Sequence, residues 1–372
     1  MGIGTRRNSL CDCGSGKKYK RCHFLREQEA PLPVSSILEA ERRARGRRCL
    51  HEADGTCRAA VIQAHTVQRA LLEKIAVDGH VYGFTPGLGS FLNSDGNLVP
   101  TKVGLSKAST FTGFCGPHDK KIFAPIEDHP IFPTKEHAFL LSYRALCKEL
   151  YAKLYVSKMG TTIKQLDRGR SQAEQKALQN FADGYLGGAA TGRRDIEIHK
   201  RKYDKILKTR DFSSVRAVFI ELSTTPHFMV SGALFPDYSF SGETLQDLSD
   251  QAAVMDAMTF SIVASGEKGL AVLTWLESPE QRQSPSGRLA DSLAEIAPEH
   301  LADALTRLTF EYFENTLISP SWWDVLHEQQ RSALLSRMES GMNSLIARHA
   351  NSLAPDGVRV VQYTARVLAR LV

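Results

Sequence analysis

The sequence predicts an α+β fold divided into several domains. The chain has 372 residues, more than one ordinary hydrophobic core holds. Apolar residues recur at helical spacing between 134 and 207, and strand-like runs follow from residue 215. Cys and His residues gather in two clusters before residue 120, a pattern typical of small metal-stapled units. We therefore expect four parts: a zinc knuckle (1–25), a second zinc-binding domain (36–130), a helical region (131–210) and an α+β domain with an antiparallel sheet and helices (211–372).

Composition excludes several classes of protein. Hydrophobic residues make up 42% of the chain and charged residues 24%, as in globular proteins. No apolar run approaches the ~18 residues of a membrane span. Residues 1–10 lack the apolar segment of a secretory signal, so we expect a cytoplasmic protein with no membrane partner. Its thiols should stay reduced, and clustered cysteines then indicate metal ligands rather than disulfides.

Positive charge is concentrated at the N-terminus. The net charge is +6, and residues 1–48 hold twelve Lys or Arg against five Asp or Glu. The basic stretches Lys17–Arg21 and Arg42–Arg48 carry most of this excess. Such segments attract polyanions through counterion release, which indicates nucleic acid or the ribosome as a partner. A solvated helix face or a tether to a protein partner is the alternative.

The first cluster is a compact run of four metal-ligand side chains: Cys11, Cys13, Cys22 and His23. Thiolate and imidazole ligands in so short a segment suit a closed tetrahedral zinc site. Gly14 and Gly16 allow the tight turns that bring both ligand pairs to one ion. The intervening lysines are expected to face solvent, because the loop is too small to bury them.

This run resembles the SEC-C motif, whose signature is similar to Cys-x-Cys-Gly-Ser-Gly-Lys-Lys-Tyr-Lys-x-Cys-Cys/His. The resemblance covers Cys11 to His23 and implies that the four side chains bind zinc. In the preprotein translocase motor, a similar tail contacts a chaperone and the ribosome. The motif also occurs as an accessory on unrelated bacterial proteins, so it identifies a module rather than the whole chain.

The second cluster is scattered and contains one ligand-type residue too many. Cys115 and His118 form a half-site that Cys49 and Cys57 would complete as a Cys₃His zinc site. His65 is then left over, after a run at 59–62 that is expected to form a strand. Alternatively His65 replaces Cys49 as the fourth ligand of a purely structural site. A third possibility is that the cluster packs without metal.

With His65 outside the ligand set, residues 49–125 resemble treble-clef zinc nucleases of the HNH type. The resemblance implies that His65 is the general base and that Asp119 helps to hold a catalytic Mg²⁺ or Mn²⁺. Asn93 or Asn97 matches the middle Asn of that family. The chain departs from the family in having Ala64 where an acidic residue is usual, and in the seven-residue gap between its first two cysteines.

Local patterns predict the remaining elements. Helices are expected from a Ser36–Glu39 capping box, from Thr66 to Ala76, and over 134–155, 163–186 and 193–207, with Gly187-Gly188 breaking the last two apart. Strands are expected at 215–222, 227–235, 254–264 and 270–276. Pro298 and Pro320 are expected to begin helices, the second running over 322–338, and residues 358–372 fit either a strand or a helix. Cys147 is expected in the core.

Overall fold

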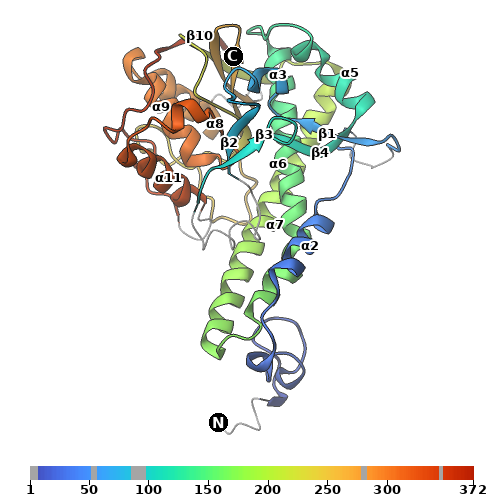
Figure 1. Ribbon diagram of the computed structural model, residues 1–372. Helices are drawn as coiled ribbons and strands as arrows, with labels where there is room; N and C mark the ends of the chain where they lie inside the picture. Colours follow the sequence, from blue (N-terminus) through green and yellow to red (C-terminus); the bar gives the residue numbers. More distant parts are fainter. Residues whose placement is uncertain (1–6, 52–56, 85–97, 278–282, 343–346) are drawn as a thin grey trace.

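We analysed a computed structural model, which describes residues 7–51, 57–84, 98–277, 283–342 and 347–372. A head of mixed helix and sheet sits on a long stalk, and the N-terminal knuckle lies at the foot of that stalk (Figure 1). The helix and sheet content agrees with the predicted α+β class. None of the described helices combines the length and apolar character that a bilayer crossing requires.

The head is built on an eight-stranded antiparallel sheet in the order β10-β5-β8-β7-β6-β9-β2-β3. Its strands are β2 (His80–Gly83), β3 (Thr101–Gly104), β5 (Val215–Leu222), β6 (Phe228–Leu234), β7 (Met258–Ser265), β8 (Lys268–Leu276), β9 (Leu317–Ile318) and β10 (Ala365–Leu371). The four strands predicted between 215 and 276 are confirmed, and the C-terminal segment is a strand. The strands β2 and β3, from the region predicted as the second zinc-binding domain, therefore extend the sheet formed by the C-terminal strands.

Both faces of the sheet are buried along its inner strands β5 to β8, each in its own core. Along β5, Ala217 and Phe219 pack into one hydrophobic cluster while Val218 and Ile220 pack into the other. This follows from the two-residue period of a strand, which sends successive side chains to opposite faces. The first face is covered by α6 (Lys135–Lys164). The second is covered by α8 (Pro285–Ala294), α9 (Pro298–Tyr312), α10 (Pro320–Trp323) and α11 (Glu328–Met342).

The stalk is the far half of a helical hairpin formed by α6 and α7 (Gln172–Thr209) (Figure 1). The predicted helix break at Gly187-Gly188 is wrong, because α7 runs through both glycines. Each glycine costs a helix only about 1 kcal/mol, which packing along α6 can offset. The chain turns instead through η3 (Gln165–Asp167), and a capping box of Ser171 and Glu174 starts α7.

Other helix boundaries also differ from the predictions. Helix α2 (Val34–Ala44) begins after Pro33, whose fixed φ suits a helix entry, and no Ser36–Glu39 capping box forms. The helix predicted over 66–76 is reduced to α3 (Arg69–Leu72). Pro298 and Pro320 begin helices as predicted, but the second helix is interrupted between α10 and α11. Cys147 lies in the core, as expected.

Candidate metal centres

The first Cys/His cluster is gathered around one point. The ligand atoms of Cys11, Cys13, Cys22 and His23 all lie within 4.8 Å of one another. The Sγ atoms of Cys13 and Cys22 are 3.5 Å apart, and His23 Nδ1 lies 3.2 Å from the Sγ atoms of both Cys11 and Cys22. Tetrahedral zinc, with Zn–S bonds of about 2.3 Å, would place its sulfur ligands about 3.8 Å apart. The four side chains therefore fit a zinc ion.

Short-range backbone geometry explains why this segment forms the knuckle. Gly14 and Gly16 have φ values of 71° and 70°, the left-handed conformation that glycine adopts without steric cost. The amide of Cys11 donates to the Lys17 carbonyl at 2.8 Å and closes the loop between the ligand pairs. The loop lysines are exposed, as expected. All four ligand side chains are thus supplied by one short segment of the chain.

The second cluster uses Cys49, Cys57, Cys115 and His118, whose ligand atoms also lie within 4.8 Å of one another. His118 Nδ1 lies 3.2 Å from Cys115 Sγ and 3.4 Å from Cys49 Sγ. The Sγ atoms of Cys57 and Cys115 are 3.6 Å apart. Of the two ligand sets that the sequence left open, the geometry brings together the one that includes Cys49 and leaves His65 out.

Burial has the dominant effect on one thiol in each cluster. It raises the pKa of Cys11 to about 12 and that of Cys115 to about 11. Zinc binds the thiolate, so metal binding must displace these protons. In the first cluster, hydrogen bonds from Ser15 outweigh burial and lower the pKa of Cys13 to about 7, so its thiolate forms most readily.

The second cluster holds together a β-strand pair and a helix. Strand β1 (Val61–His65) pairs antiparallel with β4 (Thr110–Cys115), and α5 (Gly116–Glu127) follows β4 directly. Cys115 ends β4 and His118 lies in the first turn of α5. The segment before β1 is fixed beside β4, since the amide of Leu50 donates to the Gly113 carbonyl at 2.8 Å.

His65 lies at the end of β1, opposite Thr110. Its ring is half-buried, and Nε2 lies 3.2 Å from the carbonyl oxygen of Leu105. If Nε2 carries the proton and donates to that carbonyl, Nδ1 is left as the basic nitrogen. The orientation of the ring is therefore fixed by a backbone contact and not by the zinc ligands.

Asp119 follows His118 in the first turn of α5. Burial raises the pKa of its carboxyl, while the charge of Arg144, and that of the His65 ring when it is protonated, act to lower it. His65 and Asp119 thus lie within electrostatic reach of each other. The Oδ1 atom of Asp119 is buried and has no hydrogen-bond partner among the described residues. An orphaned carboxylate oxygen of this kind fits a hard cation such as Mg²⁺.

The charges of Arg144 and Glu127 act on Asp119, and no sequence pattern pointed to either residue. Arg144 is buried on α6, donates to Glu127 Oε1 at 2.6 Å and stacks 3.8 Å from the Phe123 ring centroid. Within the described ranges, His65 and Asp119 do not belong to a group of three donors close enough to share an ion. Asn93 and Asn97, the candidates for the middle Asn, lie outside those ranges.

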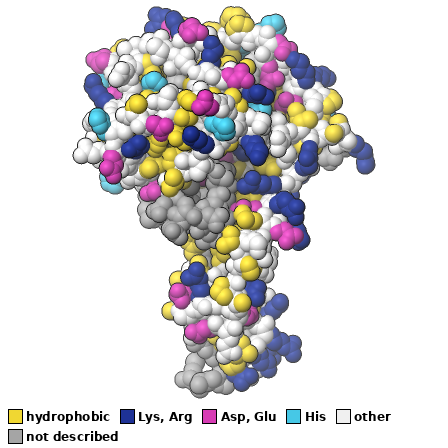
Figure 2. All heavy atoms as spheres, viewed as in Figure 1, with side chains coloured by type: hydrophobic (Ala, Val, Ile, Leu, Met, Phe, Trp, Pro, Cys, Tyr) yellow, Lys and Arg dark blue, Asp and Glu magenta, His cyan; other side chains and the backbone are white. Residues whose placement is uncertain are grey.

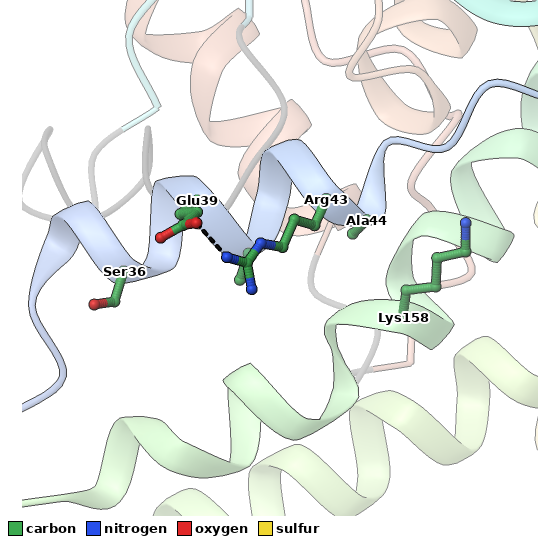
Figure 3. Close-up of a pocket in the computed structure, with 6 residues that line it drawn as sticks. Ser36, Glu39, Arg43, Ala44 and Lys158 are labelled. Atoms are coloured by element: carbon green, nitrogen blue, oxygen red, sulfur yellow. Dashed lines mark hydrogen bonds and ion pairs between the residues drawn. The ribbon is translucent and has the colours of Figure 1, made fainter.

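Basic side chains gather at two places on the stalk. Lys and Arg side chains cluster on the knuckle at its foot and again beside α2 (Figure 2). A hollow of about 400 Å³ lies between α2 and α6. Ser36, Glu39 and Arg43 line it from α2 and Lys158 from α6 (Figure 3). Glu39 forms ion pairs with Arg43 and, at 4.0 Å, with Arg42, so part of the positive charge is neutralised locally.

Comparison with known proteins identifies one module. Residues 7–25 match the family model of the SEC-C motif, in agreement with the resemblance noted in the sequence. No curated protein and no solved structure matches the chain. Together, the motif and the two Cys/His clusters indicate a zinc-binding protein.

Proposed function

We propose that the protein is a zinc-binding, metal-dependent nuclease of the HNH-like, treble-clef type, with the SEC-C knuckle as an accessory. The observation that supports this most is the arrangement of the β1–β4–α5 unit. It brings His65, at the end of the first strand, near Asp119, in the first turn of the helix, and both lie outside the zinc-ligand group. The zinc would then stabilise the unit and leave these two side chains for chemistry.

The chemistry follows from what each side chain can do. With Nε2 donating to the Leu105 carbonyl, Nδ1 of His65 accepts a proton from the attacking water. The unpartnered Oδ1 of Asp119 is the atom that would hold Mg²⁺ or Mn²⁺. When bound, such an ion stabilises the charge that develops on the scissile phosphate. Arg144 forms its own ion pair with Glu127, and its positive charge favours the ionised form of the Asp119 carboxyl.

The decisive experiment is cleavage of supercoiled plasmid DNA and of RNA by the full chain with Mg²⁺ or Mn²⁺. His65→Ala should abolish cutting, by at least the 10²-fold of a lost general base, while zinc content is retained. His80→Ala is a matched control, since His80 is an exposed histidine on β2 whose Nδ1 lies 2.7 Å from the Asp78 carbonyl oxygen. Undiminished cutting by His65→Ala would show that His65 is not the base.

A second candidate function is that of a non-catalytic zinc protein. It would bind nucleic acid, the ribosome or a protein partner through the basic residues of the knuckle and α2. It is favoured by the exposed basic surface on the stalk (Figure 2) and by the lack of a third metal donor beside His65 within the described part of the chain. In that case the wild-type chain binds nucleic acid or ribosomes but cuts neither DNA nor RNA with either metal.

A further inference from the structure

The knuckle at the foot of the stalk meets the α6–α7 tip at one buried carboxylate, Asp167. This residue ends η3 and its side chain is fully buried. Its Oδ2 accepts hydrogen bonds from His23 Nε2 at 2.6 Å and from Gln179 Nε2 at 2.7 Å. Its Oδ1 accepts from Arg26 Nε at 2.8 Å. Because an isolated buried carboxylate is costly, these donors are what make the position of Asp167 tolerable.

His23 connects this carboxylate to the first metal site. Its Nδ1 faces the Sγ atoms of Cys11 and Cys22 at 3.2 Å, while Nε2 faces Asp167. A metal-bound histidine that donates its second ring nitrogen to a carboxylate is held in one tautomer and becomes a stronger ligand. The arrangement from thiols to imidazole to carboxylate has this form, although Asp167 is far from the motif in sequence.

Further contacts tie the two parts together around Asp167. The Gln172 side-chain amide, at the start of α7, donates to the Tyr19 hydroxyl oxygen at 2.8 Å. The amide of Gly169 donates to the Arg26 carbonyl at 3.0 Å. Arg168 pairs with Glu29 at 2.9 Å. The knuckle is thus joined to the hairpin on both sides of its second ligand pair, Cys22 and His23.

We propose that Asp167 is a positioning residue of the first zinc site, so that metal binding in the knuckle and docking of the knuckle on the α6–α7 tip are one coupled step. Zinc fixes His23, and His23 fixes the hairpin tip through Asp167. The docked knuckle holds its exposed Lys17, Lys18, Lys20 and Arg21 at a defined place at the end of the stalk. Loss of the metal releases this basic face. The coupling does not depend on whether the second site is catalytic.

One test measures zinc affinity in the full chain by competition with a chelator. Asp167→Asn should weaken the first site about 10- to 100-fold and leave the second unchanged, as expected for loss of an outer-shell partner. The first site is identified as the binding step that disappears in a Cys11→Ser, Cys22→Ser chain. Asp183→Asn is the matched control, because Asp183 is a half-exposed carboxylate on the same hairpin that pairs with Lys164. Wild-type affinity at the first site of Asp167→Asn overturns the proposal.

A second test separates metal binding from docking. His23→Cys replaces the imidazole with a thiol that can still bind zinc but cannot reach Asp167. We expect this variant to keep two zinc ions per chain while amide hydrogen exchange over residues 165–179 becomes faster by tenfold or more. The same acceleration should follow in the Cys11→Ser, Cys22→Ser chain, which lacks the first metal. Wild-type protection of residues 165–179 in either variant overturns the coupling.

Discussion

The basic segment after the knuckle allows a quantitative prediction about nucleic acid binding. Replacing Arg42, Arg43, Arg45, Arg47 and Arg48 with Gln removes five exposed cations from α2 and the loop that follows it. If each contacts one phosphate, the slope of log K against log salt should flatten by about 0.9 for each contact, or about 4.5 in total. Over a fourfold rise in salt, the intact segment would then account for about a 500-fold loss of affinity.

The assay is fluorescence anisotropy of a labelled DNA duplex between 50 and 200 mM salt. Arg366→Gln with Arg370→Gln is a suitable control, because these exposed arginines lie on β10 and pair with Glu221 and Asp291. Glu39→Gln should act in the opposite direction and strengthen binding, since Glu39 neutralises Arg43 and Arg42. An unchanged salt slope in the five-residue variant would refute the argument and leave the segment as a solvated helix face.

Two further predictions concern stability. Burial raises the pKa of Glu311 to about 7, so this carboxyl stabilises the folded state fully below about pH 4.5 and loses that contribution as the pH rises to about 7. The free energy of unfolding, measured by chemical denaturation, should fall by at most about 3 kcal/mol before screening in the wild type over this pH range. Glu311→Gln should not show this fall. Parallel pH profiles of the two proteins would contradict the prediction. Gly169 has a φ of 73°, and an added Cβ would lie 2.8 Å from the Glu29 carbonyl oxygen. Gly169→Ala should therefore lower the melting temperature by several degrees, and an unchanged value would argue against the close approach.

The first zinc site could be predicted from the sequence because all its ligands and turn glycines lie in one short segment. The strands β5 to β8 could also be predicted, because each is a continuous apolar run bounded by turn residues. The helix break was predicted at Gly187-Gly188 because glycine is a poor helix former, whereas Ser171 and Glu174 form the capping box that starts α7. The capping box stabilises the start of α7, and helix packing offsets the free-energy cost of the two glycines inside it.

The second site was harder because its ligands come from separate segments, and spacing alone could not choose between Cys49 and His65. The surroundings of both sites depend on contacts between residues far apart in the chain. Asp167 contacts His23 at the α6–α7 tip, and Arg144 on α6 contacts Glu127 on α5. Neither residue stands in a motif, so only the fold reveals them.

We propose that the chain holds two closed zinc sites and that His65 belongs to neither ligand set. Elemental analysis of the purified full chain and of His65→Ala tests it most directly. We predict two zinc ions per chain in both proteins, because the eight ligands are Cys11, Cys13, Cys22, His23, Cys49, Cys57, Cys115 and His118. A wild-type chain with fewer than two zinc ions, or the loss of one ion in His65→Ala, would contradict the account.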